Sequence, residues 1–275
     1  MLYKYLPSER IDVIQNLEIR FSPLQSLNDP FEASPLIDMS LEKEDMVSFI
    51  ESGLNELWSN TKEYEKTEEN KLSLEQAKKE LIEKSEVLMC SRNAGHEVIK
   101  LLGDNLGILS LSRSEHSLLM WSHYASGNTG YVLGFHDEHE FFRKKDQRGN
   151  ITKPIAVVYS QKRIQISPKD ENYYQKLLFK KPLEWAYEEE ERIFRYFLSK
   201  ENAIGKDEYN QDIVLSELPK ETIAAVYIGY KASCETESEI LLALKKHNIE
   251  CPVYKARICD NEYKIIFDDI MRNTI

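Results

Sequence analysis

The segment best suited to chemistry is a run of four glutamates at residues 188–191, followed by Arg192. If this segment is a strand, alternation places Glu188 and Glu190 on the same face as Arg192. Adjacent acids are unfavourable in a strand, so we expect a compensating role, namely a carboxylate pair that faces a cleft. Two nearby like charges raise one pKa, which suits acid/base catalysis or the stabilisation of a developing positive charge. A solvated, charged helix face is the alternative interpretation.

A second candidate group lies in the N-terminal region. In the alternating stretch 18–22, Arg20 lies on the face opposite its apolar neighbours. A guanidinium on a strand can clamp a phosphate or a carboxylate, so we expect Arg20 to serve both binding and catalysis. The following loop contains Asn28, Asp29 and Glu32 around a proline, and we expect Asn28 and Asp29 to contribute to ligand binding. A surface arginine and ordinary turn chemistry are the alternatives.

A third group is aromatic. On a helix over residues 118–124, Trp121 and Tyr124 lie one turn apart with His123 beside them. Their rings can stack on a planar base, and His123 adds a titratable group. The strand before this helix contributes Ser110 and Ser112 to the same candidate group. Aromatic side chains at helical spacing are also typical of a core, and this alternative stays open.

These groups need elements that bring them together. Apolar alternation and β-branched runs predict strands at 2–6, 18–22, 107–112, 131–135, 155–159, 185–197, 222–228 and 253–258. Helices are expected at 11–17, 118–124 and 240–247. Strands and helices mix without a regular βαβ order, so we predict an α+β fold with a largely antiparallel, curved sheet.

Residues 41–100 differ from the rest of the chain. Charged residues crowd between apolar residues at helical spacing, and no glycine or proline occurs between Asn55 and Ser91. This composition predicts a helical insertion near the N-terminal third, with solvated outer faces and no chemistry of its own. We assign residues 1–275 to a single α+β domain that carries this insert. Pairing with a second copy through the insert, and so a homo-oligomer, is left open.

Composition argues against several classes. The 275 residues carry 36 lysines and arginines against 47 aspartates and glutamates, a net charge of −11, which disfavours broad binding to nucleic acid but not a local basic groove. No apolar stretch approaches the roughly 20 residues that span a bilayer, so we expect no membrane partner. The four cysteines form no CxxC pair, so we expect reduced thiols and a cytoplasmic location.

Standard catalytic and metal motifs are also missing from the sequence, which contains no GxGxxG, GxxxxGK[ST], HExxH or GxSxG. The segment 136–140 holds two histidines and three acids, but it follows a strand in a polar link. We interpret it as a solvated turn and predict no metal site.

The candidate segments resemble a bacterial protein family known as domain of unknown function 2971. The likeness rests on blocks along the chain outside the insert, namely Leu2-Tyr3-Lys4-Tyr5, Ile19-Arg20-Phe21-Ser22, Asn28-Asp29-Pro30-Phe31-Glu32, Ser110-Leu111-Ser112, Leu119-Met120-Trp121-Ser122-His123-Tyr124, Gly130-Tyr131-Val132-Leu133-Gly134-Phe135 and Trp185-Ala186-Tyr187-Glu188-Glu189-Glu190-Glu191-Arg192. The family name carries no activity. The resemblance therefore locates a site without saying what the site does.

A more distant likeness is to the ADP-ribosyltransferase fold, in which a strand–helix–strand opening, a serine-rich central strand and a late acidic strand build a cleft for NAD. The order Arg20, then Ser110 and Ser112, then Glu188 and Glu190 is similar to that family's Arg–Ser–Glu arrangement. The likeness implies that Arg20 grips the pyrophosphate or ribose of NAD and that Ser112 braces the cleft. The large insert between the first two elements is a departure from that arrangement.

The same likeness implies the remaining roles. Tyr124 or Trp121 would stack on nicotinamide. Glu190 or Glu188 would hydrogen-bond the ribose and stabilise positive charge at the anomeric carbon as nicotinamide leaves. The expected function is an ADP-ribosyltransferase-like enzyme that cleaves NAD and modifies a protein or nucleic-acid acceptor, with a role in bacterial phage defence that the resemblance suggests.

Two other functions are left open, both with a nucleotide-like small molecule as ligand. The first is a non-catalytic module that senses a nucleotide or a nucleic-acid end through the aromatic cluster and Arg20. The second is a metal-dependent hydrolase of phosphoesters or nucleotides, whose carboxylates and imidazole would come from Asp29, Glu32, Glu188, Glu190 and His123.

Overall fold

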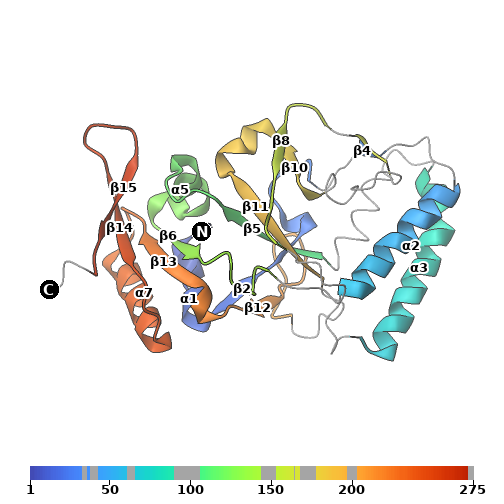
Figure 1. Cartoon of the computed structure of the whole chain (residues 1–275), viewed down its shortest axis with the longest axis horizontal. Coiled ribbons are helices and arrows are strands. Elements are labelled where there is room, and N and C mark those ends of the chain that lie inside the picture. The colour runs from blue at the N-terminus through green and yellow to red at the C-terminus, as the bar shows by residue number, and fades with distance from the viewer. Residues whose placement is uncertain are drawn as a thin grey trace.

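The computed structural model of the chain describes residues 1–32, 36–37, 43–60, 66–89, 106–143, 153–163, 165–167, 178–196 and 203–271. Within these ranges, helices and strands mix around one large and mostly antiparallel sheet (Figure 1). The sheet has two free ends and is not closed into a barrel. The predicted α+β class is confirmed.

The strands of the large sheet follow one another in space in the order β15 (Ile265–Asp269), β14 (Val253–Ile258), β13 (Ile223–Ile228), β6 (Tyr131–Phe135), β1 (Leu2–Leu6), β5 (Leu106–Ser112), β11 (Glu190–Tyr196) and β7 (Ile155–Ala156). A further strand, β3 (Ser22–Pro23), also pairs with β5. Neighbouring strands are antiparallel except β13 and β14. The remaining strands form two-stranded sheets, namely β10 (Lys180–Pro182) with β8 (Val158–Ser160), β12 (Leu215–Glu217) with β2 (Glu18–Arg20), and β4 (Leu36–Ile37) with β9 (Gln165–Ile166).

The helices of the described residues include both α-helices and short 3₁₀ helices. The α-helices are α1 (Asp12–Asn16), α2 (Lys43–Asn60), α3 (Glu68–Met89), α5 (Leu118–Tyr124) and α7 (Cys234–His247). The 3₁₀ helices are η1 (Ser8–Arg10), η2 (Leu24–Ser26), η4 (Ser126–Asn128), η5 (Leu183–Glu188) and η6 (Lys220–Thr222).

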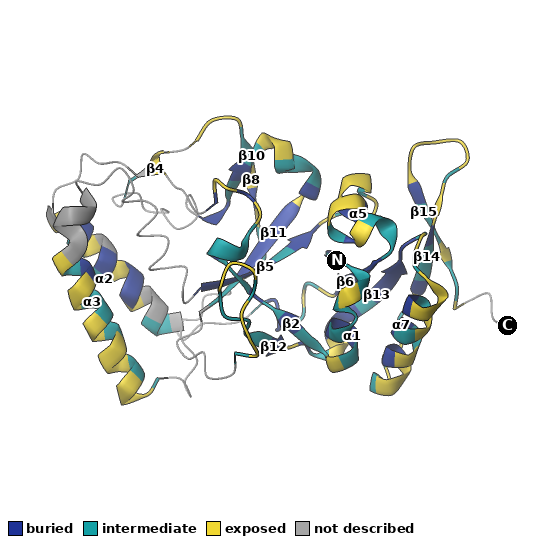
Figure 2. Ribbon diagram, turned by 180° about the vertical axis from the view of Figure 1, so that it is seen from behind, coloured by how far each residue is buried: buried dark blue, intermediate teal, exposed yellow. Residues whose placement is uncertain are grey.

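The two faces of the sheet carry separate apolar clusters, because successive residues of a strand point to opposite faces. Leu2 and Leu6 of β1 belong to one cluster, which α1 and α7 cover. Tyr3 and Tyr5 of the same strand belong to the other cluster, which α5 covers. Buried residues accordingly follow the central strands and the inner sides of these helices (Figure 2). We call the two sides the α1/α7 face and the α5 face.

Local interactions hold α5 in place above its face. The side chain of Ser117 caps the helix by accepting a hydrogen bond from the Met120 backbone N–H. After η4, the chain returns to the sheet at Gly130, where a Cβ atom would lie 2.1 Å from the Leu6 carbonyl oxygen. Only glycine permits this approach between the start of β6 and the end of β1. The position of Tyr124, the last residue of α5, follows from these two constraints.

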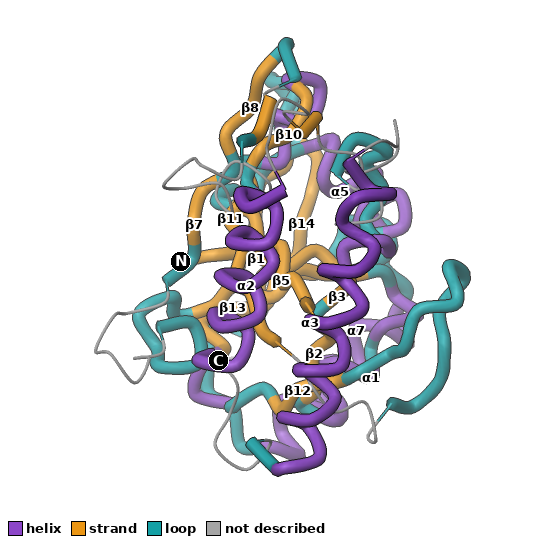
Figure 3. Tube along the Cα trace, turned by 90° about the vertical axis from the view of Figure 1, so that its right-hand side faces the viewer, coloured by secondary structure: helices purple, strands orange, loops and turns teal. Residues whose placement is uncertain are grey.

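The predicted helical insert is observed as the pair α2 and α3, which lie side by side at the end of the molecule opposite α7 and β14 (Figures 1 and 3). Met46, Ile50 and Leu54 of α2 and Leu81 of α3 are buried. Apart from these two helices, the structure describes residues 66 and 67 of the range 41–100. Among the helices that the structure describes, none is long and apolar enough to cross a bilayer.

Two predicted strands differ from the structure in ways that affect the site. The segment predicted as a strand over 185–197 begins as the 3₁₀ helix η5, and β11 starts only at Glu190. Glu189 joins the two in a left-handed conformation with φ 44° and ψ 49°. The segment predicted as a strand over 18–22 is divided, because β2 pairs with β12 and β3 pairs with β5. Alternation along the sequence gives no information on such breaks in pairing.

Candidate functional site

A pocket of about 250 Å³ opens where strand pairing at one edge of β5 is interrupted. On this edge, β1 pairs with β5 at Tyr3 and Ser112, and β3 pairs with β5 at the opposite end of the strand. The middle of β5, around Ser110, faces the pocket between these two contacts. The lining residues come from β1, β3, β5, η2 and its following loop, α5, β10, η5 and β11, and they are Tyr3, Lys4, Tyr5, Ser22, Ser26, Leu27, Asn28, Ile108, Ser110, Leu111, Ser112, Met120, Tyr124, Lys181, Glu188, Glu190 and Arg192.

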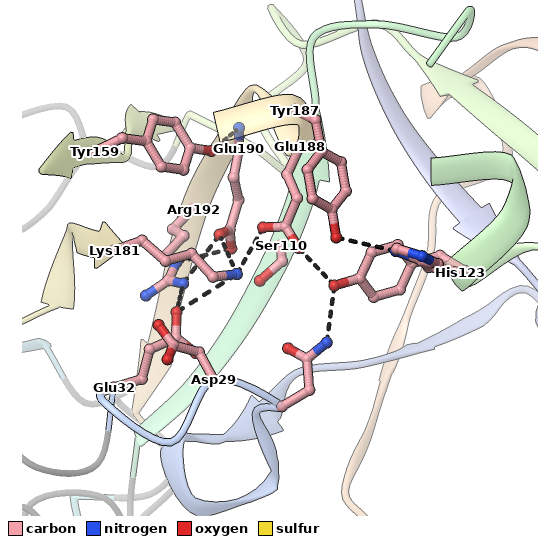
Figure 4. Close-up of polar contacts among 12 residues, drawn as sticks. Asp29, Glu32, Ser110, His123, Tyr159, Lys181, Tyr187, Glu188, Glu190 and Arg192 are labelled. Atoms are coloured by element: carbon pink, nitrogen blue, oxygen red, sulfur yellow. Dashed lines mark hydrogen bonds and ion pairs between the residues drawn. The ribbon is translucent and has the colours of Figure 1, made fainter. Parts of the chain in front are cut away.

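One wall of the pocket is a buried network of charges (Figure 4). The Lys181 ammonium donates to Glu188 Oε2 at 2.6 Å and to Glu190 Oε2 at 3.2 Å, and it lies 3.7 Å from Glu32 Oε1. Arg192 donates through Nε to Glu190 Oε1 at 2.7 Å and through Nη2 to Glu190 Oε2 at 2.9 Å. Arg192 Nη2 also pairs with Glu32 Oε1. Each buried charge therefore faces at least one opposite charge, as burial requires.

The two glutamates of this wall have different environments. Burial alone would raise the pKa of Glu190, but the contacts with Arg192 and Lys181 and a hydrogen bond from the Ser110 hydroxyl outweigh it and lower that pKa to about 2. Burial raises the pKa of Glu188 above its ordinary value, although the Lys181 ammonium opposes the shift. Glu190 is therefore ionised at neutral pH. Glu188 is the carboxyl of the pair with the better capacity to exchange a proton.

Tyr124 and Asn28 hold Glu188 at the pocket from the side opposite Lys181. The Tyr124 hydroxyl donates to Glu188 Oε1 at 2.5 Å, and Asn28 Nδ2 donates to the Tyr124 oxygen at 2.8 Å. Burial and the Glu188 charge raise the pKa of Tyr124, so its phenol stays protonated and acts as a donor. Both Glu188 oxygens are therefore positioned, and the prediction that Asn28, Tyr124 and the glutamates share a pocket holds.

The loop after η2 carries two further carboxylates just behind the pocket lining. Asp29 Oδ1 accepts a hydrogen bond from the Phe31 N–H at 3.0 Å, which shapes the turn that presents Asn28 and Glu32. Burial raises the pKa of Glu32 against the opposing charges of Arg192 and Lys181. Asp29 itself is not part of the pocket lining, so its part is to shape the loop. Within the described residues, no group of three His, Cys, Asp or Glu side chains is arranged to hold a metal ion.

The prediction that Arg20 converges on this pocket is wrong. Arg20 Nη2 donates to Asp207 Oδ2 at 2.7 Å, and Arg20 is absent from the pocket lining within the described part of the chain. Asp207 also accepts from the Ser26 hydroxyl, and these contacts lower its pKa to about 2 against the effect of burial. Arg20 thus ties β2 to a segment far along the chain. Arg192, Lys181 and Lys4 supply the cations of the pocket in its place.

Two members of the aromatic group also lie outside the pocket. Trp121 is fully buried and packs edge-on against Tyr5, with ring centroids 5.5 Å apart. It is a core residue, so the prediction that Trp121 stacks on a ligand is wrong. His123 is exposed and hydrogen-bonds the Tyr187 hydroxyl at 3.0 Å, on the outer side of α5. Ser112, in contrast, is buried in the pocket lining, where its hydroxyl and the backbone of Ser114 hydrogen-bond each other.

Sequence reasoning did not select two of the cations. Lys4 is the one charged residue within an apolar strand, and that pattern is a usable signal for a lysine with a specific partner. Lys181 adjoins Lys180 and Pro182 in a stretch without a distinctive pattern. Its role follows only from the tertiary structure, which places β10 beside η5 and β11.

Comparison with known families gives one match. Residues 120–193 match the family described as Protein of unknown function (DUF2971). The DUF2971 segment includes Tyr124, Lys181 and the run from Glu188 to Arg192, so it covers the charged wall of the pocket but neither β1 nor the Asn28 loop. No curated protein and no solved structure matches the chain significantly. The resemblance to DUF2971 is thus supported over this segment, and the likeness to ADP-ribosyltransferases stays a prediction.

Proposed function

We propose that the chain is an enzyme that binds a nucleotide of the NAD type in this pocket and breaks the bond between its ribose and its base. The observation that carries the proposal is the placement of Glu188. Its carboxylate lies in the pocket wall with one oxygen held by Tyr124 at 2.5 Å and the other by Lys181 at 2.6 Å. A fixed anion of this kind can stabilise positive charge that develops on a bound sugar.

The reaction would proceed by loss of the base from the anomeric carbon. The carbon–nitrogen bond breaks, and nicotinamide leaves with the electron pair, which neutralises its ring nitrogen. A hydroxyl or amino group of the macromolecular acceptor, or water, then forms the new bond to the anomeric carbon and releases a proton. Glu188 has the position to stabilise the cationic sugar and, because burial raises its pKa, to receive that proton.

Glu188 is a better candidate for this role than Glu190. Both oxygens of Glu190 are engaged by Arg192, and its pKa is lowered to about 2, so it is a poor proton acceptor. Its function in the proposal is to neutralise Lys181 and Arg192 and so to fix the wall. Glu188 therefore takes part in the reaction, and Glu190 holds in place the cations that position Glu188.

The size of the pocket suits part of such a ligand. Its volume of about 250 Å³ is somewhat below the roughly 300–1,000 Å³ of pockets that enclose drug-sized molecules. A base with its ribose is of suitable size, so the rest of a dinucleotide would extend towards the opening. Tyr3, Tyr5, Met120 and Tyr124 provide apolar surface for a ring.

The test is release of nicotinamide from NAD by the purified protein, compared between Glu188→Gln and Glu189→Gln. The first variant removes the pocket charge with little change in shape, and we expect a loss of turnover of about 100-fold or more. Glu189 is the exposed neighbour, so its variant is the matched control and should retain turnover. Equal thermal unfolding of the two variants would show that both fold. Undiminished turnover by Glu188→Gln, or none by the unmodified protein, would refute the proposal.

The same assay separates the alternatives. A nucleotide sensor would bind NAD without releasing nicotinamide. We do not propose the metal-dependent hydrolase, because Glu32 and Glu190 are directed at Arg192 and Lys181, and His123 lies outside the pocket. Those carboxylates are neutralised by protein cations and are poorly placed to bind a metal.

A further inference from the structure

One residue of the pocket lining is a lysine of the first strand, Lys4, whose ammonium bonds to the uncovered edge of β5. Lys4 lies between Tyr3 and Tyr5 in β1, so alternation places it on the opposite, α1/α7 face of the sheet. Lys4 is nevertheless one of the residues that line the pocket, and its ammonium donates to the Ser110 carbonyl oxygen at 3.0 Å. The side chain therefore enters the space left between β1 and β3, where it binds a carbonyl on the uncovered edge of β5.

Lys4 differs from the other two cations of the pocket in its partners. Lys181 and Arg192 each contact two or more buried carboxylates. Lys4 makes no ion pair with any residue that the structure describes, and the Ser110 carbonyl accepts one of its three N–H donors. Of the cations in the pocket lining, Lys4 is thus the one with donors available to a ligand.

The carboxylates around the pocket are already paired with cations other than Lys4. Glu188 and Glu190 of the lining, and Glu32 just behind it, each pair with Lys181 or Arg192. Lys4 has no such pair with any residue that the structure describes, so its ammonium is the one that a negative group of a ligand would pair with.

We propose that the Lys4 ammonium binds the phosphate-type anion of the ligand in this pocket. The identity of that ligand as a nucleotide rests on the proposed function, whereas the anion site rests on the contacts above. In this arrangement the phosphate lies at Lys4, and the sugar extends towards Glu188 and Tyr124. The role that the sequence suggested for Arg20 thus belongs to a lysine in the first strand.

The surroundings of Lys4 make the site sensitive to pH. Burial lowers the pKa of Lys4 to about 8, while the nearby charges of Glu190 and Glu188 raise it and that of Arg10 lowers it further. An anion prefers the protonated ammonium, so its affinity should fall as the pH rises through about 8. The bound anion should in turn raise the pKa of Lys4 and cause proton uptake near that pH.

Calorimetric titration with ADP-ribose and with inorganic pyrophosphate tests the site without any requirement for turnover. We expect Lys4→Met to weaken the binding of both by about tenfold or more, as for the loss of a charged hydrogen bond. Lys153→Met is the matched control, because Lys153 is exposed and outside the pocket lining, and it should bind as the unmodified protein does. The affinity of the unmodified protein should fall between about pH 6.5 and about pH 9.5, and that of Lys4→Met should not. Equal affinity of folded Lys4→Met and the unmodified protein would overturn the inference.

A second measurement applies if Lys4→Met does not fold. Acetylation of the unmodified protein, read by peptide mass spectrometry, should be slowed at Lys4 by ADP-ribose and unchanged at Lys153. Equal acetylation of Lys4 with and without ADP-ribose would overturn the anion site. A protein that binds ADP-ribose through Lys4 but releases no nicotinamide would instead overturn the proposed function alone.

Discussion

The two faces of the central sheet use the same strands for different purposes. On the α1/α7 face, Leu109 and Leu111 of β5 and Ile193 of β11 are buried in a continuous apolar core. On the α5 face, the intervening residues of the same strands are Ser110 of β5 and Arg192 of β11, which pair across the strands. The period of two along a strand is therefore enough to place an apolar core on one face and a charged pocket on the other.

The faces also differ in what stabilises them. The α1/α7 face gains stability from apolar burial, which changes gradually with the size of a side chain. The α5 face buries Glu32, Lys181, Glu190 and Arg192, whose desolvation is tolerable only while each charge has its partners. Removal of one charge from the α5 face should therefore lower the free energy of unfolding strongly. Removal of one methyl group from the α1/α7 face should lower it only slightly.

The largest effect is expected from Arg192→Met, which leaves Glu32 and Glu190 buried with less compensation. Removing one partner of a buried ion pair costs about 3–5 kcal/mol of unfolding free energy, which urea denaturation would measure. Arg257→Met is the control, because Arg257 and Asp268 are half-exposed and pair at 2.7 Å on the surface. It should cost less than about 1 kcal/mol. An Arg192→Met protein as stable as the control would contradict the contrast between the faces.

A smaller effect is expected from Ile193→Val, which alters the adjacent residue of β11 on the opposite face. Ile193 is buried in the apolar core, and loss of one methylene typically costs about 0.5–1.5 kcal/mol. Affinity for ADP-ribose should stay unchanged, because the removed methyl group does not face the pocket. A large loss of ADP-ribose affinity in this variant would show that the two faces are not independent.

Much of the fold could be predicted because it depends on local pattern. The apolar alternation of 2–6, 107–112 and 131–135 marks three central strands, which correspond to β1, β5 and β6. The helical spacing of 118–124 corresponds to α5. The strand predicted over 185–197 was wrong for its first residues, because the left-handed Glu189 ends a 3₁₀ helix before β11 begins.

The site could be predicted only in part, because partners far apart in the sequence decide the role of each side chain. Tyr124, Asn28 and the two glutamates lie in one pocket as expected. Arg20 has the alternation of a ligand-binding residue, but Asp207, 187 positions away, takes its guanidinium. No sequence pattern in either segment predicts the Arg20–Asp207 ion pair.

Trp121 and Lys4 show the same limit at shorter range. Helical spacing groups Trp121 with Tyr124 but does not decide which of the two rings faces the core, and the structure buries Trp121 completely. Strand alternation assigns Lys4 to the α1/α7 face, yet its long side chain crosses to the pocket through the interrupted pairing between β1 and β3. Strand alternation predicts the face of the sheet on which the Cβ atom lies. The ammonium of a long, flexible lysine side chain can lie some distance from that position.

A crystal structure of the protein with ADP-ribose would show whether Lys4 and Glu188 belong to one ligand site. We expect the ligand in the pocket between β1 and β3, with a phosphate oxygen at Lys4 Nζ and a ribose hydroxyl at the Glu188 carboxylate. ADP-ribose bound on another surface, with Lys4 and Glu188 making no contact to it, would refute the roles proposed for both residues.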